Sequence, residues 1–409
     1  QCPYEKNSND TMAFSPKVLI VSDVEKAISD FRKTYEDALL LYVSNRARFY
    51  DIGAGNLYDA YNKMEKYQFW KKYSAVDVMT KDEARINDAL LSFLFIVDQI
   101  IEYYLQECYG EVFRNIHEYY MYFNSEKYIV EKHRDKKTIK TRLEKIKNSY
   151  VDRATTIDGF LNICFKEEFI EEEIYCSIIE DDDYQLVKDV YIEEVRKLTN
   201  YLNDPRVSTQ HGVKGESHDT VVFVADNSSN PAVHMSKFFE VWSEMNITLR
   251  EFDAFYYRYS NMIKDIECTM GIKISELKAK SYAAVADMID TVLKRFISEN
   301  ENNPYYIFLL KPKMEKYKKK KNVTSAKACL NEGTVYGPLC AYRLFYVGCS
   351  RARKNLLIII NREDVKNFED KLYEKLNEMD VPEDMKHMSL AIARDVHEIK
   401  KDYIRIIQG

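Results

Sequence analysis

Two short apolar runs, far apart in this chain, each directly follow a polar loop. Val221–Val224 comes after a loop rich in polar residues and glycine, and Leu356–Ile360 comes after a helix-like turn that contains Arg351. Uninterrupted β-branched runs of this kind are typical of parallel strands buried on both faces. The two segments therefore predict an α/β protein that carries polar groups at the edge of one parallel sheet.

The start of the chain predicts further elements of the same kind. Residues 17–22 are typical of a buried strand, and Asp23 is placed to cap a helix over 24–35. A second strand is expected at 39–43 and a turn at 52–56. We interpret the Gly-containing turn as a turn only, because it lacks the spacing and the lysine of a phosphate loop.

Between these strand segments the chain is predicted to be mostly helical. No proline occurs between Pro16 and Pro205, and residues 86–105 have a broad apolar helical face. The 32 tyrosines are spread evenly, which favours packing at half-buried positions over base stacking.

A second helical stretch is expected after Val224, with helices over 235–259 and 274–300. The lysine-rich run 311–321 is predicted to be an exposed loop. An amphipathic segment over 363–379 should pack on the sheet, and a last helix is expected over 383–406.

The two polar segments resemble two motifs of the second RecA-like domain of UvrD/Rep-like superfamily 1 helicases. The residues that match are Thr209, His211, Lys214 and Gly215 in the first string, and Leu344, Tyr346, Val347, Ser350, Arg351 and Ala352 in the second. The family's usual Gly-Leu-Glu is replaced by Gly215-Glu216-Ser217, so the acidic residue comes one position early.

The resemblance implies a RecA-like parallel sheet, similar to a P-loop NTPase without its P-loop, in a chain that is mostly α overall. Residues 13–56, 204–226 and 341–409 would form this domain, with the two motifs in its last two parts. Residues 57–203 would be a helical insertion like that of the family, and 227–340 a second one where the family's interval is normally much shorter.

The resemblance also implies roles for seven residues. Arg351 would act as an arginine finger that stabilises charge on the γ-phosphate, although a surface arginine is the alternative. The nucleotide would lie beside Lys214, Gly215 and Glu216, and single-stranded DNA would be gripped by Ser208, Thr209 and His211. His218 has no such support and is interpreted as structural. No metal-ligating residue is predicted.

The chain has no Walker A loop and no strand that ends in paired Asp-Glu. We therefore expect ATP and Mg²⁺ to bind only in a full-length enzyme with an N-terminal RecA-like domain, and the isolated chain, which begins at Gln1, to be inactive. Two alternatives remain open. One is a non-catalytic, degenerate helicase module that binds a protein or nucleic acid. The other is an all-helical scaffold with two chance matches and almost no sheet.

Composition narrows the class of protein. The net charge is −6, so nucleic-acid contacts would have to come from local basic patches such as 131–147 and 311–321. These runs are equally well interpreted as solvent-exposed faces without a binding role. The eight cysteines show no paired spacing, which favours reduced thiols in a cytoplasmic protein. No apolar stretch is long enough for a membrane span, and a protein partner is expected to bind through the helical insertions.

Overall fold

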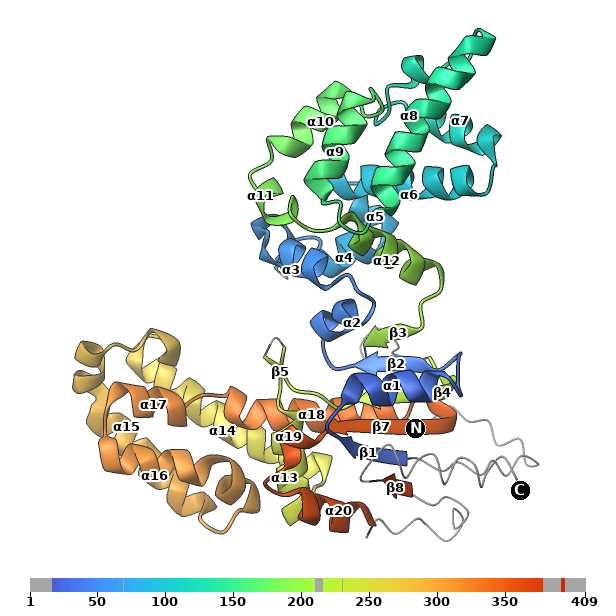
Figure 1. Ribbon diagram of the computed structural model, residues 1–409. Helices are drawn as coiled ribbons and strands as arrows, with labels where there is room; N and C mark the ends of the chain where they lie inside the picture. The colour runs from blue at the N-terminus through green and yellow to red at the C-terminus, as the bar shows by residue number, and fades with distance from the viewer. Residues whose placement is uncertain (1–16, 69, 210–215, 230, 378–390, 394–409) are drawn as a thin grey trace, which may run out of the picture. The chain divides into compact units, whose positions relative to one another are not determined.

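The computed structural model has two compact units, shown in Figure 1. Residues 1–44 and 208–409 form the sheet unit, and residues 45–207 form the helical unit. The residues that the structure describes are 17–68, 70–209, 216–229, 231–377 and 391–393.

The sheet unit contains a six-stranded sheet with the strand order β3-β2-β4-β7-β1-β8. Its strands are β1 (Lys17–Val21), β2 (Leu39–Tyr42), β3 (Val207–Thr209), β4 (His218–Val224), β7 (Ala352–Asn361) and β8 (Ala391–Ala393). The neighbours from β2 to β8 pair in parallel. A short antiparallel pair, β5 (Ser228–Ser229) and β6 (Ala232–Val233), lies outside it. The parallel sheet confirms the α/β prediction and contradicts the all-helical alternative.

The first elements form where the sequence predicts them. β1 is almost entirely buried, and the Asp23 side chain accepts a hydrogen bond from the backbone N–H of Lys26 (2.9 Å) at the start of α1 (Val24–Arg32). The expected turn at 52–56 contains Gly53 in the left-handed conformation, with φ of 77°.

The apolar core of the sheet unit explains which helices lie on the sheet. Alternate residues of the central strands, such as Val221, Phe223 and Ile358, pack with α13 (Met235–Glu244), α18 (Gly333–Cys349), α19 (Arg362–Val365) and α20 (Glu369–Asn377). The amphipathic segment expected over 363–379 is confirmed, since its apolar residues Val365, Phe368, Leu372 and Leu376 belong to this core. α13, which lies within the predicted insertion 227–340, is part of the sheet's own packing instead.

The helical unit surrounds α6 (Ala89–Leu105), and most of the apolar residues of this helix are fully buried. Its other elements are α2 (Asn45–Asp51), α3 (Gly55–Lys63), η1 (Glu65–Tyr67), α4 (Ala75–Thr80), α5 (Asp82–Arg85), α7 (Tyr109–Glu118), η2 (Ser125–Tyr128), α8 (His133–Val151), α9 (Ile157–Lys166), α10 (Glu172–Ile179), α11 (Tyr184–Val187) and α12 (Ile192–Asn203). The unit begins at Asn45 rather than 57 and ends at Val207 rather than 203.

No helix among the described residues has the length and apolar character needed to cross a membrane.

Several tyrosines are fully buried, which is deeper than the half-buried positions that the sequence suggests. Tyr61 donates to Asp88 (3.0 Å), Tyr150 to Asp98 (2.8 Å) and Tyr128 to the backbone carbonyl of Glu167 (2.9 Å). Each buried hydroxyl therefore has an acceptor, which offsets the cost of removing it from water.

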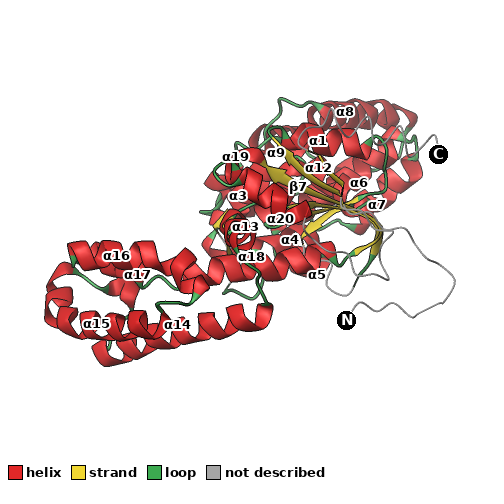
Figure 2. Ribbon diagram, turned by 90° about the horizontal axis from the view of Figure 1, so that it is seen from below, coloured by secondary structure: helices red, strands yellow, loops and turns green. Residues whose placement is uncertain are grey.

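A second helical core lies between α13 and α18. It contains α14 (Leu249–Met270), η3 (Ile274–Glu276), α15 (Ala279–Asn300), η4 (Tyr306–Leu310), α16 (Lys311–Lys320) and α17 (Val323–Cys329), and we call these elements the bundle. Figure 2 shows α14 and α15 along one side and α16 and α17 along the other.

Three sequence predictions in these regions are wrong. The helix expected over 235–259 is divided into α13 and α14, which is capped by Thr248. The lysine-rich run is the helix α16, because Met314 and Tyr317 bury an apolar face one turn apart. Residues 391–393, expected in a helix over 383–406, form β8, and the rest of that range lies outside the described residues.

α18 belongs to both cores of the sheet unit. Its residues Val335 and Leu339 pack in the bundle, whereas Ala341 and Leu344 pack against the sheet. The helix also contains Pro338, and Gly337 before it accepts a hydrogen bond from the backbone N–H of His234 (3.1 Å).

We predict that Gly337→Ala lowers the free energy of unfolding by about 1–3 kcal/mol. A methyl group at this position would lie 2.4 Å from Nδ1 of His234, and a side chain before proline disfavours helical backbone. Urea denaturation measures the change. Gly110→Ala in α7 is the matched control, because nothing lies within 4 Å of its added methyl group. Equal stability of the two variants would contradict the prediction.

Candidate functional site at the amino edge of the sheet

The pairing of β4 with β7 brings the two sequence strings together. His218 is in register with Ala352 and Val221 with Leu356, and the backbone N–H of His218 donates to the carbonyl of Arg351 (2.9 Å). Both polar segments precede their strands, so they meet at the amino edge of the parallel sheet.

Three consecutive side chains of β7 donate hydrogen bonds along this edge. Arg353 Nε donates to Ser217 Oγ (2.9 Å), Lys354 Nζ to Asp219 Oδ2 (2.6 Å) and Asn355 Nδ2 to Thr220 Oγ1 (3.1 Å). The hydrogen bond from Lys354 lowers the pKa of Asp219 below its usual value. These contacts are solvent-exposed or partly so, and they align the strings more than they stabilise the fold.

Arg351 lies between the end of α18 and the start of β7 and is half-buried. Its Nη1 donates to the backbone carbonyl of Glu216 (3.1 Å), which belongs to the other string. Its Nε is shielded from solvent and has no hydrogen-bond partner among the described residues. The side chain is therefore held at the edge of the sheet by one contact and is not enclosed in the core.

Gly348 allows α18 to approach the sheet closely just before Arg351. A methyl group there would lie 3.1 Å from the ring of Phe223 in β4, which is closer than ordinary van der Waals contact. The end of α18 is thus set against β4, and the position of Arg351 follows from that packing.

The remaining candidate residues of the first string lie in different environments. Glu216 is exposed, and its carboxylate lies 3.2 Å from Nε2 of His218. Ser208 is half-buried in β3, whereas the side chain of Thr209 is only 5% exposed. His211, Lys214 and Gly215 lie outside the described residues. The structure therefore brings Arg351 and Glu216 together and leaves the loop between Thr209 and Glu216 undescribed.

The opposite, carboxyl edge of the central strands carries two carboxylates that the sequence analysis did not single out. Asp226 follows β4 and Asp364 follows β7, and burial is the largest cause that raises the pKa of each. Within the described part of the chain, no group of three or more His, Cys, Asp or Glu residues is arranged to hold a metal ion.

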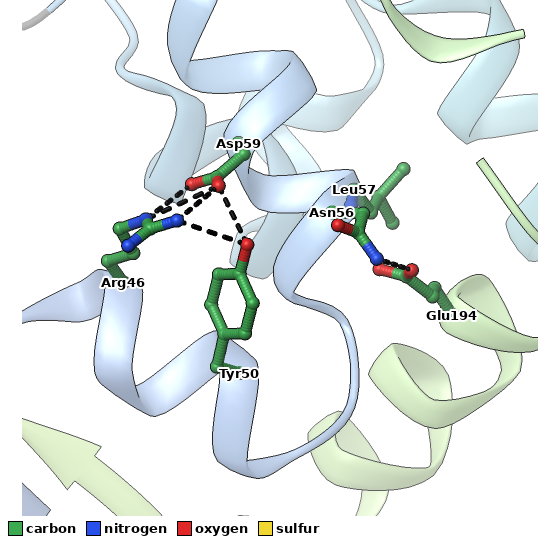
Figure 3. A network of polar contacts seen from close by, with 6 residues as sticks. All are labelled: Arg46, Tyr50, Asn56, Leu57, Asp59 and Glu194. Carbon is green, nitrogen blue, oxygen red and sulfur yellow. Dashed lines mark hydrogen bonds and ion pairs between the residues drawn. The ribbon is translucent and has the colours of Figure 1, made fainter. Parts of the chain in front are cut away.

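The helical unit contains a polar network, drawn in Figure 3. Arg46 of α2 binds Asp59 of α3 through Nε (2.9 Å) and Nη2 (2.8 Å), and the Tyr50 hydroxyl donates to the same carboxylate (2.8 Å). The hydrogen bond from Arg46 lowers the pKa of Asp59. A bidentate pair with a third donor fixes the angle between α2 and α3.

Glu194 of α12 forms the second part of this network (Figure 3). Its buried carboxylate accepts from the backbone N–H of Leu57 (2.9 Å) and from the side chain of Asn56 (2.7 Å). Ala54, the residue before α3, has no side chain that can cap the helix. Glu194 supplies the missing acceptor from a distant helix, and it joins α3 to α12.

Sequence reasoning also missed Arg48 in α2. This arginine is 7% exposed, lies against the rings of Phe49 (4.6 Å) and Tyr201 (5.9 Å), and burial lowers its pKa. Its Nε and Nη2 have no hydrogen-bond partner among the described residues. A buried cation is normally paired, but nothing in the sequence around residue 48 distinguishes this arginine from a surface one.

The chain matches no family model, and no curated protein or solved structure matched it. The geometry of the residues is therefore the basis for any function assigned below.

We predict that Glu194→Ala lowers the free energy of unfolding by about 1–3 kcal/mol, because the buried backbone N–H of Leu57 and the side chain of Asn56 lose their acceptor at the start of α3. The neighbouring Glu193→Ala is the control. Its carboxylate makes only two long ion pairs, with Arg153 (3.4 Å) and Lys197 (3.7 Å), so we expect a change of about 0.5 kcal/mol or less. Urea denaturation compares the variants, and a Glu193 effect as large as that of Glu194 would refute the capping role.

Proposed function

We propose that this chain is the C-terminal motor half of an ATP-dependent, UvrD-like DNA helicase or translocase. The observation that carries the proposal is the contact between the two strings, in which Arg351 of one donates to the carbonyl of Glu216 in the other. Two segments that matched the motifs only by chance would not be expected to lie next to each other at one edge of a sheet. We propose that the parallel sheet belongs to a RecA-like domain.

The environment of Arg351 supports its proposed role as an arginine finger. Such a residue must be oriented by its own domain and must keep donors for a phosphate supplied by a neighbour. Arg351 is half-buried and is oriented by one hydrogen bond from Nη1. Its Nε is shielded from solvent, so Nη2 is the donor that remains for a phosphate. This arrangement suits a guanidinium whose remaining donors are completed by an anion.

The amino edge carries donors for phosphate but no set of carboxylates that fits Mg²⁺ among the described residues. Mg²⁺ and most contacts with ATP would therefore be provided by the N-terminal RecA-like domain of the full-length enzyme. Hydrolysis of ATP would drive movement along single-stranded DNA. Residues of this chain contribute charge stabilisation through Arg351, and Lys214, Gly215 and Glu216 would line the nucleotide.

Single-stranded DNA is the proposed substrate of the loop that follows β3. Ser208 retains a half-buried hydroxyl, and His211 lies in the undescribed part of the loop. The buried side chain of Thr209 suits a role in anchoring the loop to the sheet, with DNA contacts made by its neighbours and by loop amides.

We expect Arg351→Ala in the complete gene product to lower DNA-stimulated ATP hydrolysis about 10³-fold or more, because the loss of an arginine finger removes transition-state stabilisation. Affinity for single-stranded DNA should change little. Arg353→Ala is the matched control, since Arg353 lies at the same edge, where it donates a hydrogen bond to Ser217 and its charge acts on Asp219. Steady-state ATPase and fluorescence anisotropy measure the two properties.

The isolated chain, residues 1–409, should hydrolyse no ATP, because it has no Walker A loop. Hydrolysis by this chain that disappears in Arg351→Ala would overturn the proposal. So would equal loss of activity in the Arg351 and Arg353 variants.

The alternative is a non-catalytic module that binds a partner through its helical parts. One observation favours it: large apolar side chains near the end of α7 and the start of α8 are exposed, including Tyr120 (64%), Met121 (66%) and Ile129 (46%). A Walker A loop upstream in the same reading frame would favour the enzyme, and its absence from the gene would favour the module.

A further inference from the structure

The bundle has the opposite charge balance to the whole protein. Residues 249–331 contain sixteen lysines and arginines against ten aspartates and glutamates, whereas the net charge of the chain is −6. Positive charge is thus concentrated in one helical subdomain of an acidic protein. Such segregation has no role in folding a helical core and is typical of surfaces that bind polyanions.

The excess charge lies mainly on the outer face of α16. Met314 and Tyr317 turn inward to the bundle core, and Lys311, Lys316, Lys318, Lys319 and Lys320 are all exposed. None of these five lysines forms an ion pair within the described part of the chain. We call them the α16 lysine face. Glu315 is the one acidic residue of the helix.

Several other cations of the bundle are paired with carboxylates, unlike those of the α16 lysine face. Lys294 binds Asp290 (2.7 Å), Arg295 binds Glu299 (2.8 Å) and Lys273 lies 3.4 Å from Glu267. The carboxyl end of the helix dipole favours lysines in the last turn, which explains the tolerance of Lys318–Lys320. It does not account for Lys311 and Lys316, which precede the last turn.

The chemistry of the face selects the kind of polyanion. Of the aromatic residues closest in the sequence, Tyr305, Tyr306 and Tyr317 are buried and Phe308 is half-buried against the bundle core, so the face has charge without an exposed platform for base stacking. Proteins that bind single strands usually combine charge with exposed aromatics. Ammonium groups without aromatics suit the sugar–phosphate backbone of a duplex, and a helix of ten residues is about 15 Å long, enough to meet several successive phosphates.

We propose that the α16 lysine face binds the backbone of double-stranded nucleic acid, independently of its sequence. The inference rests on the proposed function only in its choice of nucleic acid as the partner. The surface lies in a different element from the β3–β4 loop and from Arg351, so the two proposals fail separately.

The test variant is Lys316→Gln, Lys319→Gln, Lys320→Gln in the full chain, with binding of a short fluorescent duplex DNA measured by anisotropy over a salt series. We expect affinity to fall about tenfold or more at 0.1 M salt, and the slope of log K against log salt to become shallower by about 2–3. The loss should be the same for duplexes of unrelated sequence. Single-stranded DNA of the same length should be affected less.

The matched control is Lys273→Gln, Lys294→Gln, Arg295→Gln, which removes the same number of charges from ion-paired sites of the bundle. It should bind duplex nearly as well as the unaltered chain. Equal losses in the two variants would show general electrostatic attraction and overturn the proposal. Absence of duplex binding by the unaltered chain, or equally tight binding of poly-glutamate, would also overturn it.

These outcomes are distinct from failure of the proposed function. The α16 variant should leave the effect of Arg351→Ala on ATP hydrolysis unchanged, because it alters no residue at the amino edge. A duplex-binding α16 face in a protein without any ATPase would retain this inference and remove the motor assignment.

Discussion

The backbone pairing of β4 with β7 is the interaction on which the rest of the candidate site depends. It joins segments that are far apart in the sequence and sets the register that puts Arg351 beside Glu216. The apolar parts of both strands, Val221–Val224 and Leu356–Ile360, are buried on both faces, so a slip of one residue would exchange two apolar sets. The register is therefore strongly specified, and with it the geometry of the polar edge.

A parallel sheet usually binds ligands beyond the carboxyl ends of its strands. Here the matching strings meet at the amino ends, while the carboxyl edge carries Asp226 and Asp364 with raised pKa values. An amino edge has no helix N-termini directed at a ligand, so by itself it is a poor nucleotide site. It suits a surface that completes a site whose phosphate-binding elements are in a neighbouring domain, which agrees with the lack of a Walker A loop in the sequence.

Local patterns predicted the sheet well, because strands buried on both faces leave continuous apolar runs, as at 17–22 and 356–360. They failed where the decisive contacts are distant in sequence. The many lysines of 311–321 predicted a loop, whereas the segment is a helix because Met314 and Tyr317 pack in the bundle core. The capping of α3 by Glu194 and the burial of Arg48 depend on partners brought together only by folding. At the candidate site, the strings identified Arg351 and Glu216, but only the register showed them in contact.

The shared membership of α18 in two cores has a mechanical consequence. α18 is anchored at one end in the bundle and at the other against the sheet, and Arg351 follows its sheet end. A displacement of the bundle would therefore be passed through one continuous helix, which contains Pro338, to the segment that carries Arg351. The bundle also cannot be excised with its packing intact, because a cut at either end of α18 would leave one of the two cores without the apolar side chains that this helix contributes.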